Sequence, residues 1–154
     1  PEDYDLWLRA MRSGLRFGKV PDVLLYWRDQ ENRTSRTDGR YHQNEFLKCK
    51  AHHLAMGPLK KSQEVVLWGA GRIGKRLGRY LEEEGMTLRA YLDIDPKKIG
   101  THRRGVLVFD AQELEQFKGI PLVTAVGSRG ARALIRDRLK ESGWQEGSDY
   151  YCAA

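Results

Sequence analysis

The chain has 154 residues, of which 40% are hydrophobic and 31% charged, and 27 Lys and Arg against 21 Asp and Glu give a net charge of +6. This is an ordinary globular composition, and no apolar run approaches the ~20 residues that span a bilayer. The positive charge is spread along the chain, whereas nucleic-acid binders more often concentrate it on one element. We therefore expect no membrane segment and no nucleic-acid partner.

Two further features bear on origin and compartment. The chain begins with Pro1, which indicates a piece of a longer protein. Cys49 and Cys152 lie far apart and lack the spacing of a metal or redox motif, so a reducing, cytoplasmic compartment is expected.

Residues 1–56 are predicted to be mainly helical. Apolar residues over 6–11 predict a helix that stops near Gly14, and residues 17–27 have strand character interrupted by Pro21. A polar turn region and a polar helix over 41–55 follow. The segment has few core candidates for its length, so it is expected to depend on another part of the protein for stability.

A breaker, Gly57-Pro58, opens a predicted linker over 57–63. Strands and helices then alternate over 64–154. This alternation predicts an α/β fold with a small, doubly wound parallel sheet, Rossmann-like and of about five strands. The expected strands are 65–68, 88–92, 106–109, 121–126 and 150–152, and the expected helices are 73–84, 111–117 and 131–142.

The most informative motif is a Gly-x-Gly-x-x-Gly turn at the end of the first of these strands. Gly69 permits a sharp turn, Gly71 permits close approach of a pyrophosphate, and Gly74 permits close packing of the following helix. Arg72 and Ile73 lie within the turn, where the helix N-terminus favours an anion. These five residues are predicted to bind a cofactor.

Asp93 closes the second strand about 20 residues beyond the glycines, where an acid accepts hydrogen bonds from ribose hydroxyls. The alternative is that Asp93 and Asp95 stabilise a turn before Pro96, and a weaker one is an Asp-x-Asp metal site. Ser128 follows the fourth strand and either binds phosphate or begins the last helix as its N-cap. No metal ligand set is predicted in this chain.

One resemblance concerns the beginning of the chain. The runs Glu2-Asp3-Tyr4-Asp5-Leu6-Trp7-Leu8-Arg9 and Pro21-Asp22-Val23-Leu24-Leu25-Tyr26-Trp27-Arg28 resemble the C-terminal end of the catalytic domain of family two glycosyltransferases, which are inverting enzymes of the GT-A fold. The resemblance implies that residues 1–56 are a mainly helical remnant of such a domain. It implies Asp3 as the catalytic base, Glu2 as its acidic partner, and Arg28 as a residue that contacts substrate.

The same resemblance implies a partner and cofactors. The donor-binding domain of that family lies upstream, so it would be the missing partner and would hold the nucleotide-sugar and an Mg or Mn ion. Without it the fragment is expected to be inactive. The parent would transfer a sugar to a hydroxyl acceptor in bacterial polysaccharide biosynthesis, at the inner face of the membrane.

Residues 64–154 resemble, more diffusely, the Rossmann-like domains appended to sugar-processing enzymes, through Leu92-Asp93-Ile94-Asp95-Pro96-Lys97-Lys98-Ile99-Gly100. Two alternatives to the transferase fragment stay open. One is a nucleotide- or NAD-binding Rossmann domain of oxidoreductase type. The other is a non-catalytic interaction module that keeps its glycines only for packing.

Overall fold

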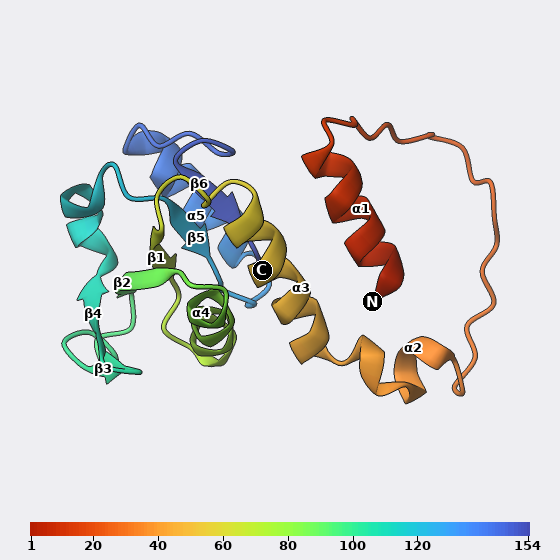
Figure 1. The fold of residues 1–154 in the computed structure, drawn as a ribbon, viewed down its shortest axis with the longest axis horizontal. Coiled ribbons are helices and arrows are strands. Elements are labelled where there is room, and N and C mark those ends of the chain that lie inside the picture. The colour runs from red at the N-terminus through yellow and green to blue at the C-terminus, as the bar shows by residue number, and fades with distance from the viewer. The chain divides into compact units, whose positions relative to one another are not determined.

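The structure is a computed structural model that describes all 154 residues, and the chain forms two compact units, Pro1–Cys49 and Lys50–Ala154 (Figure 1). The predicted boundaries 1–56, 57–63 and 64–154 stay a prediction. Residues 57–63 form hydrogen-bonded turns after helix α3, and Leu59 among them is fully buried. No helix is long and apolar enough to cross a membrane.

The first unit is helical. It contains α1 (Glu2–Arg12), the short helix α2 (Thr34–Thr37), the 3-10 helix η1 (Gly39–Tyr41) and the start of α3 (Gln43–Met56). Acidic residues in the first turn of α1 and arginines in its last turn suit the helix dipole. The helices predicted over 6–11 and 41–55 are confirmed.

The strand predicted over 17–27 is wrong. This stretch is extended but pairs with no other strand, and the side chains of Val23 to Trp27 are 72% to 90% exposed. Composition favours a strand here, but a strand also needs a neighbour to satisfy its backbone N–H and C=O groups. No neighbour is present in the first unit.

The second unit is an α/β fold around one six-stranded sheet with the order β3-β4-β2-β1-β5-β6. All neighbouring strands are parallel except β3 and β4. The strands are β1 (Glu64–Trp68), β2 (Thr87–Asp93), β3 (His102–Arg103), β4 (Val106–Asp110), β5 (Leu122–Thr124) and β6 (Tyr150–Cys152).

Helices cover both faces of this sheet, as the predicted doubly wound fold requires. They are α4 (Arg72–Glu83), the 3-10 helix η2 (Ala111–Phe117) and α5 (Ala131–Glu141). Gly78 of α4 lies over Leu67 and Tyr91 on one face. On the other face, Val66 and Trp68 pack with residues of η2 and α5. Strand β1 is therefore buried on both sides, which explains its almost wholly apolar sequence.

The parallel strands and both longer helices of this unit lie where the sequence predicts them, to within a few residues. Two details differ. The sheet has six strands, because the two-residue β3 is too short to leave a pattern in the sequence. Residues 111–117 form a 3-10 helix, begun by Asp110, whose side chain accepts a hydrogen bond from the N–H of Gln112.

Candidate functional site

The carboxyl ends of β1, β2 and β5 open into a crevice of about 730 Å³. The chain leaves β1 through α4 toward one side of the sheet and leaves β5 through α5 toward the other. The neighbouring strands β1 and β5 thus form a topological switch point, which is where open α/β sheets bind their ligands.

The three motif glycines have three different surroundings. Gly69 has a φ of +117°, and a Cβ added there would lie 2.8 Å from Val126, so the turn requires glycine. A Cβ on Gly74 would lie 1.7 Å from the carbonyl oxygen of Gly69. A Cβ on Gly71 would meet nothing within 4 Å. Gly69 and Gly74 therefore build the turn, whereas Gly71 leaves open space on the crevice.

Helix α4 begins at this open space. Its N-cap is Gly71, and no side chain accepts a hydrogen bond from its first turn. The first N–H groups of a helix have no partner within the helix and carry a partial positive charge. Arg72 and Ile73, the first two residues of α4, line the crevice. The arrangement can hold an anion such as a pyrophosphate.

Asp93 connects the second strand to the glycine loop. Asp93 is 7% exposed as a whole residue. Its carboxylate accepts hydrogen bonds from the N–H of Ala70 at 2.8 Å and from the N–H of Asp95 at 3.0 Å. The Nζ of Lys98 lies 3.3 Å from it as well. The turn role that the sequence left open is therefore present, together with a tie to the glycine loop that sequence reasoning did not foresee.

Lys98 joins two acids at this corner of the crevice. Its Nζ lies 3.3 Å from a carboxylate oxygen of Asp95 as well as near Asp93. Burial works against the charge of Lys98, but hydrogen bonds and charges from both acids raise its pKa overall. The backbone N–H of Lys97 donates to Asp95 and lowers the pKa of that carboxyl. The charged groups of Asp93, Asp95 and Lys98 are therefore held in place by contacts with one another.

The opposite wall comes from the loop after β5 and from α5. Ser128 lines the crevice, but it is not the N-cap of α5, which is Gly130 without a side-chain hydrogen bond. The predicted cap is wrong because the chain makes one more turn before the helix begins. Arg138 also lines the crevice and donates to the carbonyl of Ala111 at 3.3 Å.

Sequence reasoning missed several residues of this crevice, including two cationic and two exposed apolar side chains. The sequence indicates such residues only by their spacing of one helical turn or their place after a strand. This is weak evidence unless one knows which strands are neighbours. Ile94 and Leu134 are apolar yet 73% and 72% exposed. The four residues are Ile94, Lys98, Leu134 and Arg138.

The residues predicted to be catalytic lie in the first unit. Glu2 accepts a hydrogen bond from the hydroxyl of Tyr41, and this bond lowers the pKa of Glu2. Asp3 is exposed on α1, and Arg28 is exposed in the extended stretch. The hollow of this unit is lined by Glu2 but by neither Asp3 nor Arg28. Glu2 and Asp3 are neighbours in α1, but no hydrogen bond or ion pair joins either of them to Arg28.

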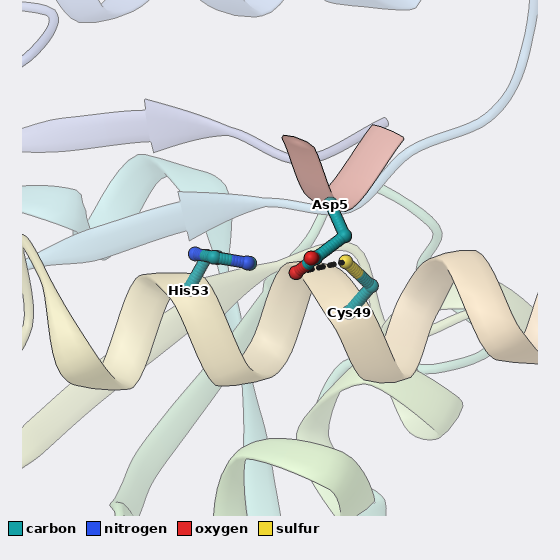
Figure 2. A group of neighbouring side chains, drawn as sticks. All are labelled: Asp5, Cys49 and His53. Carbon is teal, nitrogen blue, oxygen red and sulfur yellow. Dashed lines mark hydrogen bonds between the residues drawn. The ribbon is translucent and has the colours of Figure 1, made fainter. Parts of the chain in front are cut away.

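In the same unit, Cys49 makes one of the contacts between α1 and the start of α3. Figure 2 shows the thiol of Cys49 directed at the carboxylate of Asp5, with 4.0 Å between Sγ and Oδ1. Burial, followed by the charge of Asp5, raises the pKa of this thiol. Both cysteines are free.

With this geometry in view, comparison with known proteins decides the family. The family model described as "CoA binding domain" matches residues 60–141, which is more than half of the chain. The chain belongs to the CoA-binding domain family. The matched residues contain the glycine loop, Asp93 and every residue that lines the crevice.

Relatives of this domain have regulatory names. The redox-sensing transcriptional repressor Rex 1 of Thermotoga maritima is 36% identical over 92 residues, which cover 55% of this chain and 44% of the relative. The structure of RSP, a Rex-family repressor, matches with a TM-score of 0.50 and 24% identity over 65% of this chain and 49% of RSP. RSP in complex with β-NAD+ and operator DNA matches with a TM-score of 0.46 and 24% identity over 58% of this chain and 48% of RSP. The chain spans less than half the length of these proteins.

These findings overturn the predicted membership of glycosyltransferase family two. The predictions that depended on this membership are also wrong. They are the GT-A remnant, the sugar transfer, the role in polysaccharide synthesis and the missing donor-binding domain as partner. The matching family is a CoA-binding domain, and the curated relative is a redox-sensing repressor. Acids in a first turn followed by apolar residues stabilise amphipathic helices of many proteins, so the motif at residues 2–9 was poor evidence of chemistry.

The exclusion of a nucleic-acid partner is overturned too, because the curated relative is named a transcriptional repressor. The evenly spread charge of this chain describes only the part of such proteins that it spans. The alternative prediction, a nucleotide- or NAD-binding Rossmann domain, agrees better with the family and the relatives.

Proposed function

We propose that the unit Lys50–Ala154 binds a nicotinamide dinucleotide, NAD+ or NADH, in the crevice beside the glycine loop, and that it serves as a redox-sensing module. The observation that carries the proposal is the open space in front of Gly71 at the uncapped start of α4. Backbone N–H groups face that space, and a pyrophosphate is the anion that such a loop at a switch point accommodates.

The charge around the crevice supports an anionic ligand. Arg72, Lys98 and Arg138 line it together with two acids, Asp93 and Asp95. Arg72 forms no ion pair, so its guanidinium is available to a phosphate oxygen. Apolar Ile94 and Leu134 offer surface to a planar base, which would remove their exposed area from water.

The nicotinamide cofactor is favoured over other nucleotides because of the relatives. Rex 1 is named redox-sensing, and a dinucleotide fold senses redox state most directly through a ligand with an oxidised and a reduced form. One mononucleotide-binding half is present, so we assign the ADP portion of the cofactor to this chain.

Fluorescence titration with NADH tests the proposal. Trp68 lines the crevice, so bound NADH should quench its emission and accept its excitation energy. NAD+ and ADP-ribose should compete with NADH, since they share the ADP portion. Coenzyme A is the essential competitor, because the family description names it. Stronger binding of coenzyme A than of NADH would reject the nicotinamide assignment.

A pair of glycine variants controls for location. Gly71→Val places a branched side chain in the open space and should abolish NADH binding without loss of folding. Gly18→Val is the matched control, since a Cβ at Gly18 also meets nothing within 4 Å and the residue lies outside the second unit. Unchanged affinity of the Gly71 variant would show that the ligand binds elsewhere.

A further inference from the structure

Between α1 and α2 the chain runs as an extended stretch (Figure 1), and part of it exposes large apolar side chains. Val23 to Trp27 are five consecutive residues, each 72% to 90% exposed. The guanidinium of Arg33 lies 4.1 Å from the centre of the Trp27 ring, yet Trp27 stays 75% exposed. The five residues expose roughly 700 Å², whereas the largest apolar patch on a typical monomer is about 300–600 Å². A patch of this size marks an interaction surface.

The chemistry of this stretch favours a β-strand as its partner. Val, Tyr and Trp side chains favour extended backbone. No backbone–backbone hydrogen bond involves residues 16–29, so their N–H and C=O groups can pair with an approaching strand. Pro21 lacks an N–H group and limits the ladder to the residues that follow it. An antiparallel pair of identical strands has a twofold axis, so a second copy of this chain offers the matching edge.

One antiparallel register makes the apolar run complementary to itself. Its centre is Leu25, which lies opposite Leu25 of the second copy. Val23 then lies opposite Trp27 of that copy. Leu24 likewise lies opposite Tyr26. Pairs of an aromatic with an aliphatic side chain are favourable contacts between neighbouring strands, so both flanking pairs stabilise this register.

Opposite charges meet at both ends of the same register. Asp22 lies opposite Arg28 of the second copy, and Arg28 lies opposite Asp22 of that copy. Both side chains are exposed and form no ion pair within the chain, whereas the neighbouring Asp29 pairs with Arg33 and Arg36. A shift of the register by one residue in either direction would separate the two charges. The charges therefore select the same register as the apolar pairs.

We propose that this stretch binds a second copy of the chain, and that residues 22–28 of the two copies form an antiparallel β-pair centred on Leu25. The roughly 700 Å² on each copy is close to the ~800 Å² that each partner buries in a stable interface. The pairing lies in the first unit, outside the residues 60–141 that match the CoA-binding family. It does not depend on binding of a nicotinamide dinucleotide.

Sedimentation velocity of the full chain measures the dimer. Leu25→Lys should abolish it, because two like charges would face each other at the twofold axis. Leu15→Lys is the matched control, since Leu15 is 63% exposed but lies outside the pairing segment, and it should dimerise like the wild type. A wild type that stays monomeric at about 100 μM overturns the proposal, and so does a dimer that survives Leu25→Lys.

Exchange of the two end charges tests the register. Asp22→Arg and Arg28→Asp each make two cross-strand pairs repulsive, so each should weaken the dimer about tenfold. The double variant restores opposite charges in this register and should recover most of the affinity. The single effects should shrink at high salt, because both side chains are exposed. Non-specific apolar association gives no such recovery, so a double variant as weak as the single ones overturns the register.

Disulfide cross-linking tests the twofold axis in a chain that carries Cys49→Ser and Cys152→Ser. In this register the two Cα atoms at position 25 lie about 5 Å apart, whereas those at position 23 lie about 14 Å apart. A disulfide spans Cα atoms up to about 7 Å apart. Oxidation should therefore give a covalent dimer with Leu25→Cys and not with Val23→Cys. Equal cross-linking of the two variants overturns the proposed pairing.

Discussion

A methyl group on Gly74 would lie 1.7 Å from the carbonyl oxygen of Gly69. The start of α4 therefore touches the turn that precedes it, and backbone rather than a flexible side chain limits the space. We expect Gly74→Ala to lower the free energy of unfolding by about 3 kcal/mol, because the helix must move off the loop. Urea unfolding followed by circular dichroism measures this.

Gly71→Ala is the matched substitution, since the added methyl group meets nothing within 4 Å. Its unfolding free energy should stay within about 1 kcal/mol of wild type, the small change expected on replacing glycine without strain. Equal destabilisation by the two variants would contradict the separate roles given to these glycines.

Tyr91 is fully buried in β2, and its hydroxyl has no hydrogen-bond partner. Burial, reinforced by the charge of Glu82, raises the pKa of Tyr91 to about 12. Tyr91→Phe removes an unsatisfied polar group, so at pH 8 it should leave stability unchanged or raise it by about 1 kcal/mol.

The pH dependence of the same variant has a defined sign. The folded pKa lies above the ordinary value of 10.0, so the neutral phenol stabilises the fold fully below pH 10 and this contribution is lost as pH rises toward 12. The stability advantage of Tyr91→Phe should therefore grow between pH 9 and pH 11. Urea midpoints at both pH values provide the measurement, and a constant difference would refute the burial argument.

Asp110 begins η2 with reciprocal hydrogen bonds. Its side chain accepts from the N–H of Gln112 at 2.8 Å, and its own N–H donates to Glu113 at 3.1 Å. Asp110→Ala should cost about 1 kcal/mol, the usual effect of losing an N-cap side chain. Asp110→Ser keeps an acceptor and should recover most of the loss in thermal unfolding. No recovery would mean that the charge, not the cap, matters.

Asp38 precedes η1 in the first unit and pairs with Arg40, whose Nη2 lies 2.7 Å from its carboxylate. The side-chain hydrogen bond from Arg40, followed by the bond from the Arg40 N–H, lowers the pKa of Asp38 to about 2. Its contribution to the turn is therefore present above the ordinary value of 3.8 and is lost as pH falls through 2.

Carboxyl carbon NMR during acid titration measures the pKa of Asp38 directly. In Arg40→Ala the pKa should return toward its ordinary range, since the guanidinium is gone and only the backbone N–H remains. A value near the ordinary range in the wild type would show that the pair is not formed in solution.

Much of the second unit could be predicted because its signals are local. The apolar run 65–68, the glycines after it and the helix start at Arg72 follow from residues next to one another in the chain. The crevice partners of the loop could not be predicted in this way. Lys98 and Arg138 reach it from elements whose position depends on strand order.

The first unit illustrates the opposite case. Residues 17–27 have the composition of a strand, yet no neighbouring strand is present to pair with them. Likewise the motif at residues 2–9 resembles a catalytic segment, but Asp3 and Arg28 do not share a hollow with each other. Amino-acid composition gives a segment a propensity for extended backbone, but a strand forms only where a neighbouring strand pairs with it.

The sequence by itself determined the alternation of strands and helices, the glycine turn and the acid at position 93, since each depends on backbone preferences of adjacent residues. Only the tertiary structure decided what that acid does. Ala70 and Asp93 are 23 positions apart, and they meet because β1 and β2 are parallel neighbours whose ends lie at the same edge of the sheet. That contact ties the carboxylate of Asp93 to the glycine loop at the edge of the crevice.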